Sequence, residues 1–151
     1  MAATPRENAA LVRRFLTNVV AGGDTDAVSV FLTEDVGNHN LVFGDGSREG
    51  ATALGWRVLA GTDVTIDIED VVASEERVAV RGMVSGSHRE SLMDLAPTGA
   101  SFEIACVWFC RIDDGRIADI CSLPDGLGLM QQLGTIPEMP SNHSRNGPKR
   151  N

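Results

Sequence analysis

His88 is the side chain of this sequence best suited to acid–base chemistry. It closes one face of a predicted strand whose other members are valine or glycine: Val78, Val80, Gly82, Val84 and Gly86. An imidazole in such surroundings is partly withdrawn from water and could serve as a general base. The alternative is a buried histidine whose ring nitrogens are satisfied by neighbouring groups. The two interpretations differ in whether the ring faces a pocket.

Two further ionisable side chains could take part in such chemistry. His39 lies between Asn38 and Asn40, and because asparagines commonly hold turns, a loop-fixing role competes with a catalytic one. Asp125 precedes an apolar, helix-like segment from Leu127 to Leu133, where an aspartate is a good helix cap. If its carboxylate is buried instead, it could transfer protons.

A β-hairpin around Asp114-Gly115 is the clearest structural signal. This dipeptide supplies the positive φ angles of a two-residue type I′ turn, and strand-like runs flank it from Phe102 to Ile112 and from Arg116 to Leu123. The predicted ladder pairs Asp113 with Arg116, Ile112 with Ile117, Cys110 with Asp119, and Trp108 with Cys121.

Both faces of this hairpin are largely apolar. The predicted ladder gives one face these members: Phe102, Ile104, Cys106, Trp108, Cys110, Asp119, Cys121 and Leu123. Trp108 is then either core or the wall of a pocket. The opposite face carries Ala105, Val107, Phe109 and Ile120. Exposing an apolar sheet face to water is unfavourable, and such a face is most often buried against a second copy of the chain in a two-fold dimer. We therefore expect a homodimer through the sheet.

The upstream pattern changes from helical to strand-like near Gly61. The predicted helices run from Pro5 to Gly22-Gly23 with Thr4 as cap, from Asp24 or Thr25 to Leu32, and from Ser47 through Leu59, with a polar loop between Asp35 and Ser47. The predicted strands run from Val64 to Glu69 and from Val78 to His88, and a longer connection follows from Arg89 to Ala100. Helices followed by an antiparallel meander predict an α+β fold, with helices covering one face of a curved sheet.

Length and composition limit the class of protein. The 151 residues fit one domain, which we place at 1–137, followed by a polar tail at 138–151 that we expect to be disordered. A net charge of −8 argues against nucleic acid and anionic membranes as partners and favours a small molecule. No segment resembles a signal peptide or a membrane span, so we expect a cytoplasmic protein.

The motifs of metal and nucleotide sites are missing from the sequence. The three cysteines, Cys106, Cys110 and Cys121, lack Cys-x-x-Cys spacing, so buried free thiols are expected rather than a zinc site. Gly44-Asp45-Gly46 is a turn without the rest of a phosphate-binding motif. We therefore expect no metal and no cofactor.

Several short motifs follow one another in a recognisable order. They are Asn38-His39-Asn40, Gly86-Ser87-His88, Pro97-Thr98-Gly99, the run R-I-D-D-G-R-I from Arg111, and L-M-Q-Q-L-G from Leu129. Together they resemble the SnoaL-like polyketide cyclases of the NTF2-like superfamily, over about residues 8 to 137. The resemblance implies an NTF2-like α+β cone, with N-terminal helices packed on a curved antiparallel or mixed sheet around an interior cavity.

The resemblance also implies an activity. We expect a cofactor-independent cyclase or isomerase that removes a proton α to a carbonyl of a small, largely apolar compound. His88 would be the base, with Asp125 or His39 as its partner. The side chains expected to contact the substrate are Trp108, Asn40, Cys121 and Phe102.

The sequence departs from the family in one important place. The cyclases carry an acid–base His and Asp at facing positions of the terminal hairpin, and those positions here hold Trp108 and either Cys121 or Ser122. Two alternatives follow. One is a non-catalytic small-molecule-binding domain, and the other is an enzyme similar to epoxide hydrolases, which needs a convergent Asp-Arg-Asp set. The chain has no tyrosine, so it lacks the tyrosine oxyanion hole of the related ketosteroid isomerases.

Overall fold

The computed structural model describes residues 3–39, 63–89, 91 and 95–137. Its helices are α1 (Pro5–Arg14) with the π-helical continuation η1 (Phe15–Ala21), the 3-10 turn η2 (Thr25–Ala27), α2 (Val28–Phe31) and α5 (Gly126–Gln132). Its strands are β1 (Leu32–Asn38), β2 (Thr65–Ala73), β3 (Arg77–Ser87), β4 (Ser101–Asp113) and β5 (Arg116–Pro124). Asn40, the helix predicted after Ser47 and the C-terminal tail lie outside these ranges.

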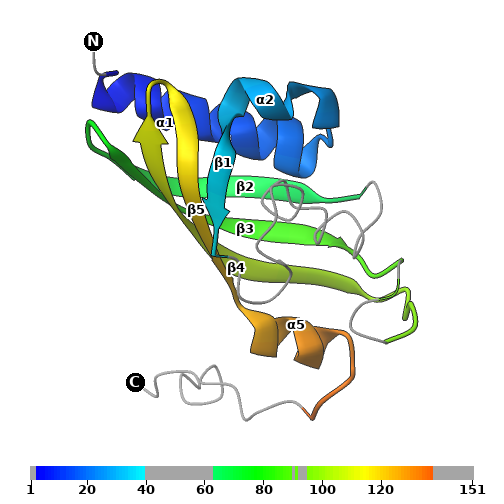
Figure 1. Ribbon diagram of the computed structural model, residues 1–151. Coiled ribbons are helices and arrows are strands. Elements are labelled where there is room, and N and C mark those ends of the chain that lie inside the picture. The colour runs from blue at the N-terminus through cyan, green and yellow to red at the C-terminus, as the bar shows by residue number, and fades with distance from the viewer. Residues whose placement is uncertain (1–2, 40–62, 90, 92–94, 138–151) are drawn as a thin grey trace, which may run out of the picture.

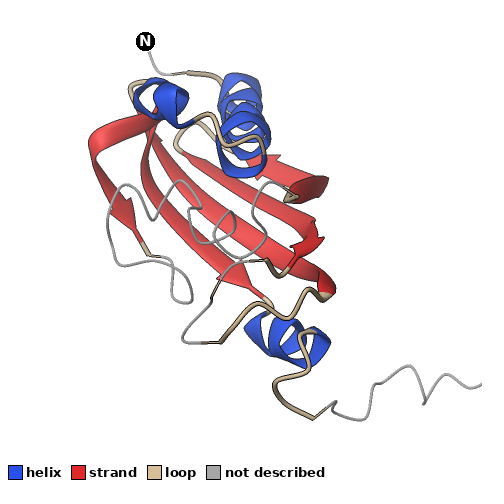
Figure 2. Cartoon of the chain, turned by 90° about the vertical axis from the view of Figure 1, so that its right-hand side faces the viewer, coloured by secondary structure: helices blue, strands red, loops and turns tan. Residues whose placement is uncertain are grey.

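The five strands form one curved sheet in the order β1-β5-β4-β3-β2. Strands β2 to β5 are an antiparallel meander, and β1 joins β5 in parallel. Helices α1 and α2 lie on one side of the sheet, and α5 lies at the far end of β4 and β5 (Figures 1 and 2). The α+β class with a mixed sheet is therefore confirmed.

The N-terminal helix forms as its sequence predicts. The Thr4 hydroxyl accepts the Glu7 backbone N–H at 3.2 Å, and the Glu7 carboxylate accepts the Thr4 N–H at 2.8 Å, which completes a capping box. The apolar stripe is buried against the sheet: Leu11, Val12, Phe15, Leu16, Val19 and Val20. No helix in the described ranges is long and apolar enough to cross a membrane.

Strand β1 is absent from the sequence-based expectation. We expected Leu32 to end a helix and Asp35 to begin a loop, and the loop prediction is wrong over Asp35 to Asn38. Only Leu32 and Val36 of this strand are buried, and its register on β5 shifts between Leu32 and Gly37. An irregular strand of this kind has no period-two alternation for a pattern search to find.

The terminal hairpin contains a β-bulge that changes the predicted register. Asp113 pairs with Arg116 and Ile112 with Ile117, as expected, but Arg111 is then opposite Asp119 and Ala118 is the extra residue. A shift of one residue moves every later side chain to the other face of a sheet. The predicted pairings of Cys110 with Asp119 and of Trp108 with Cys121 are therefore wrong.

The corrected register defines two faces of the sheet. The inner face, toward the helices, carries the core side chains of β3, β4 and β5, including Val80, Trp108 and Ile120, each 1% exposed. The outer face carries Asp119, Cys121 and Leu123 together with Ala105, Val107 and Phe109, since the partner of Phe109 on β5 is Cys121. Ile120, which we had placed on the outer face, belongs to the core.

Candidate functional site

Buried polar side chains are rare in the described part of the chain, where Asn8, His88 and Ser122 are the three found. The Asn8 amide donates to the Ser74 and Glu75 carbonyls, at 3.0 and 2.9 Å, and so ties helix α1 to the β2–β3 turn. Because Asn8 has this structural task, His88 and Ser122 are the two buried polar residues of the described ranges that remain as candidates for a site.

His88 follows the last residue of β3 and is fully buried. Its backbone N–H donates to the Ala100 carbonyl at 2.8 Å, and its own carbonyl accepts the Gly99 N–H at 2.9 Å. Gly99 has a φ of +71°, a conformation that glycine adopts without strain. This turn brings the two motifs Gly86-Ser87-His88 and Pro97-Thr98-Gly99 into direct contact.

Thr98 determines the tautomer of the His88 ring. The Thr98 backbone N–H donates to Nδ1 at 3.1 Å, so Nδ1 presents a lone pair and carries no proton. The Thr98 hydroxyl lies 3.0 Å from the same nitrogen and accepts the Ala100 N–H at 3.2 Å, which leaves its hydrogen free to point at Nδ1. In the neutral ring the proton must therefore be on Nε2.

The Nε2–H group of His88 is buried and has no hydrogen-bond partner within the described ranges. The described ranges contain three other buried side-chain atoms without a partner, Asn8 Oδ1, Thr33 Oγ1 and Gln131 Nε2. A buried donor without an acceptor costs about 1–3 kcal/mol, and His88 Nε2 is the one of these atoms that belongs to an imidazole. An acceptor atom of a bound molecule would satisfy this one. In this tautomer His88 is a hydrogen-bond donor, and it could act as a base only if its bond to the Thr98 N–H were broken.

Trp108 and Ser122 face each other at the centre of the inner face. Ser122, and not Cys121, is the residue directly opposite Trp108, and both side chains are buried. These are the positions at which the resemblance leads us to expect an acid–base pair. Cys121 is half-buried on the outer face, so the prediction that it shares a pocket wall with Trp108 is wrong.

The buried cysteines of the inner face are neutral thiols. Burial raises the pKa of both Cys106 and Cys110 to about 12, with the Asp119 carboxylate adding to the rise at Cys110. A thiol is a poor nucleophile until it loses its proton, so neither group is activated for covalent chemistry. Among the described residues, no cluster of three potential metal ligands occurs.

Asp125 caps helix α5. Its carboxylate accepts the Gly128 N–H at 2.9 Å, its backbone N–H donates to the Ala105 carbonyl at 2.9 Å, and its side chain is exposed. We considered a helix cap and a proton-transferring carboxylate for Asp125, and its contacts are those of a helix cap.

His39 lies beyond the end of β1 and pairs with Asp119. Its Nε2 is 2.9 Å from the Asp119 carboxylate, and its side chain is 60% exposed. The backbone N–H of His39 donates to the Ile120 carbonyl at 2.8 Å, so the chain at this point continues the edge of the sheet. Asp119 belongs to the outer face, which places this contact on the side of the sheet away from Trp108.

The three predicted catalytic side chains do not meet. The His88 backbone bonds to Ala100, just before β4, and the Asp125 backbone bonds to Ala105 on β4. The His39 backbone bonds to Ile120 on β5, which is opposite Cys110 on β4. At roughly 3.4 Å per residue, these positions are spaced roughly 17 Å apart along the strand. Phe102 lies close to His88, because it is buried and pairs with Gly86, two residues before His88.

Sequence reasoning missed Thr98 as the partner of His88. The Pro97-Thr98-Gly99 motif was noted as a loop, but nothing in its local pattern indicates that the loop folds back onto the strand end ten residues earlier. The sequence did not decide whether Cys121 or Ser122 is opposite Trp108, because the answer depends on the bulge at Ala118.

Comparisons with known proteins agree with this fold. A sequence model of the SnoaL-like polyketide cyclase family matches residues 10–133. No curated protein matches the chain in a sequence search.

Solved structures of similar proteins have the same architecture. IdmH from Streptomyces antibioticus, provisionally assigned as a polyketide cyclase, is 25% identical, with a TM-score of 0.69 over 83% of this chain and 96% of that one. A provisionally assigned SnoaL-like polyketide cyclase from Jannaschia sp. CCS1 is 16% identical, with a TM-score of 0.77 over 91% and 98%. AclR from Streptomyces galilaeus, provisionally assigned as a hydroxylase, is 18% identical, with a TM-score of 0.75 over 97% of each chain.

Proposed function

The chain belongs to the SnoaL-like polyketide cyclase family, and from this premise we propose that it is a cofactor-independent cyclase or isomerase. Its substrate is a small, largely apolar carbonyl compound that binds on the inner face of the sheet. The observation that carries the proposal is the buried, unpartnered Nε2–H of His88, whose tautomer is held by Thr98.

In this proposal His88 stabilises negative charge. Removing a proton α to a carbonyl places charge on the carbonyl oxygen, and a fixed N–H aimed at that oxygen lowers the barrier. The donor is effective because the ring is held before the substrate arrives and needs no reorientation. The general base is then a group other than His88, since the Nδ1 lone pair is already used by Thr98.

Proton exchange tests the proposal without knowledge of the natural product. The probe is α-tetralone, an apolar ketone with exchangeable α-protons, incubated with the protein in D₂O and followed by NMR. The protein should accelerate exchange over buffer. His88→Phe should remove about 10²–10³ of that acceleration, whereas His88→Gln, which can both accept and donate a hydrogen bond, should retain part of it. Equal rates for the three proteins would contradict the donor role.

A second candidate is a non-catalytic binding domain. Trp108 opposite Ser122, at the positions where an acid–base pair is expected, favours it. Saturable binding of α-tetralone without any acceleration of exchange would support this candidate. The epoxide hydrolase alternative gains no support, because all aspartates and arginines of the described ranges are exposed or half-buried.

A further inference from the structure

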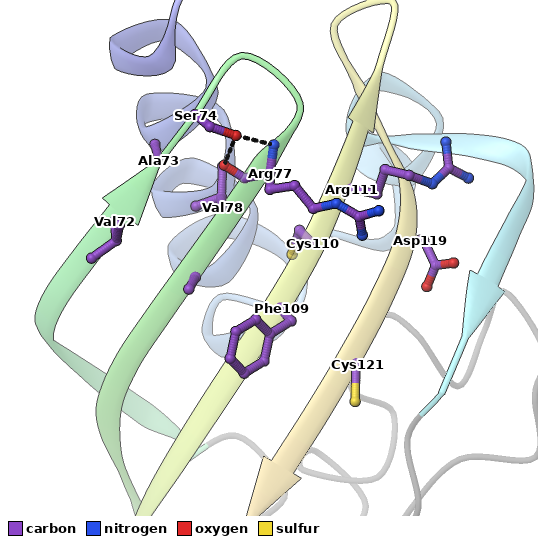
Figure 3. A pocket seen from close by; sticks show the side chains of 11 residues that line it. Val72, Ala73, Ser74, Arg77, Val78, Phe109, Cys110, Arg111, Asp119 and Cys121 are labelled. Carbon is purple, nitrogen blue, oxygen red and sulfur yellow. Dashed lines mark hydrogen bonds between the residues drawn. The ribbon is translucent and has the colours of Figure 1, made fainter.

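The outer face of the sheet contains a cavity that the inner-face chemistry does not use. Its volume is about 390 Å³, and it extends from the β2–β3 turn across β3 and β4 to β5 (Figure 3). Small-molecule pockets typically occupy roughly 300–1,000 Å³, so this cavity could hold a compact organic ligand. The sheet separates it from His88 and Trp108.

Apolar side chains make up one part of this cavity. Phe109 is 54% exposed and Val72 is 66% exposed, and Cys121 is half-buried beside them. Leaving such side chains in water forgoes the roughly 25 cal/mol per Å² that burial of their surface would gain. An apolar ligand group lying on Phe109 would recover part of it.

Two arginines make up the other part. Arg77 on β3 is directly opposite Arg111 on β4, and both side chains belong to the face that carries Phe109. Figure 3 shows the Arg77 side chain extending from β3 over β4, above Phe109 and Cys121 in that view. Like charges directly opposite each other on a sheet are destabilising unless a counter-charge is present.

Within the described part of the chain, neither guanidinium forms an ion pair, although the whole chain carries a net charge of −8. Asp119 is the cross-strand neighbour of Arg111, yet its carboxylate contacts His39 at 2.9 Å instead. Among the described residues, therefore, no carboxylate contacts either guanidinium directly, and the Asp119 carboxylate at the same cavity is engaged by His39.

The backbone of Arg77 is firmly held. Its N–H donates to the Ser74 hydroxyl at 3.0 Å, and its carbonyl accepts the Ser74 N–H at 2.7 Å. The same turn is anchored to helix α1 by the buried Asn8. The backbone from which the Arg77 side chain projects is thus fixed before any ligand binds.

We propose that this outer-face cavity binds a small-molecule carboxylate with an apolar tail. The carboxylate bridges Arg77 and Arg111, and the tail lies against Val72, Phe109 and Cys121. Guanidinium groups match the planar carboxylate with paired hydrogen bonds, which makes arginine well suited to this task. Asp119 at the same cavity disfavours a second negative charge, so a monoanion fits better than a phosphate, which carries close to two charges near pH 7.

Calorimetry with 4-phenylbutyrate tests this site on the full chain. The compound has one carboxylate and one aromatic tail, and 4-phenylbutyramide has the same tail without the charge. We expect saturable binding of one carboxylate per chain and clearly weaker binding of the amide. Arg77→Gln and Arg111→Gln should each weaken binding by roughly tenfold, as expected for the loss of a charge-assisted hydrogen bond.

Arg81→Gln is the matched control. Arg81 lies on the same face of β3 but is directed to Glu69, at 4.0 Å, and is not part of the cavity. This variant should bind 4-phenylbutyrate as the wild type does, and so should His88→Gln, which alters only the inner face.

Four results would overturn the proposal. They are no saturable binding, equal affinity for the amide, unchanged affinity in both cavity variants, and loss of binding in His88→Gln, which would place the ligand on the inner face. If light scattering shows a dimer and 4-phenylbutyrate fails to bind, a second copy of the chain is the better occupant of this face.

Discussion

At the scale of single residues, one backbone N–H decides what His88 can do. The Thr98 N–H occupies the Nδ1 lone pair, so the ring offers a proton on Nε2 rather than a site to receive one. We expected a base from the amino-acid type and its apolar surroundings, and both were reasonable guides to burial. They contained no information about the tautomer, which depends on a contact between two segments separated by a loop.

We expect the Thr98 hydroxyl to contribute less to holding the His88 ring than the Thr98 N–H. Thr98→Val keeps the backbone donor but removes both the acceptor of the Ala100 N–H and the hydroxyl contact with Nδ1. We expect the free energy of unfolding to fall by about 1 kcal/mol, with the His88 ring unchanged. Urea denaturation checks this, with Thr65→Val on the exposed side of β2 as the control. A loss above about 3 kcal/mol would show that the hydroxyl, and not the N–H, holds the ring.

The buried thiols predict a fall in stability at alkaline pH. The pKa of Cys106 and Cys110 rises from 9.0 to about 12 on folding, so the native state keeps its protons while the unfolded state loses them. The resulting stabilisation is complete below pH 9 and is lost as the pH rises toward 12. Few other side chains titrate there, because the chain has no tyrosine and Lys149 is its single lysine.

Urea midpoints at pH 8 and pH 10.5 under reducing conditions measure this effect. The midpoint of the wild type should be lower at pH 10.5, and the decrease should be smaller in a variant carrying Cys106→Val and Cys110→Val. A wild-type midpoint that does not change between the two values would contradict the burial of these thiols as neutral groups.

At the scale of elements, local signals predicted structure well and long-range ones did not. The capping box at Thr4 and the turn at Asp114-Gly115 depend on neighbouring residues and form as expected. The bulge at Ala118 and the pairing of β1 with β5 depend on how distant segments pack, and they leave no periodicity in the sequence. This is why the fold class could be predicted while the faces of β5 could not.

Helix α5 provides a test of the role of Asp125. Asparagine caps a helix nearly as well as aspartate, whereas alanine does not. Asp125→Ala should lower the free energy of unfolding by about 0.5–2 kcal/mol, and Asp125→Asn should leave it almost unchanged. Both variants should retain the wild-type rate of α-tetralone exchange. A strong loss of exchange in a stable Asp125→Asn protein would restore the catalytic interpretation of this carboxylate.

At the scale of the whole molecule, the exposed outer face favours self-association. Leu123 is 45% exposed and lies opposite Val107, toward the α5 end of the sheet and away from Arg77 and Arg111. We propose a homodimer through this end of the face, with a mass of twice 16.1 kDa by light scattering at micromolar concentration. Leu123→Asp should give a monomer that still binds 4-phenylbutyrate. A monomeric wild type would refute the dimer.

The protonation state of the His88 ring is the most direct test of its role as a hydrogen-bond donor. Long-range ¹H–¹⁵N NMR on ¹⁵N-labelled protein distinguishes the two ring nitrogens, since an unprotonated nitrogen resonates far downfield of a protonated one. The contact with Thr98 predicts an unprotonated Nδ1 and a protonated Nε2 whose resonance shifts when α-tetralone binds. A proton on Nδ1 would contradict the contact with Thr98, and with it the donor role on which the proposed function depends.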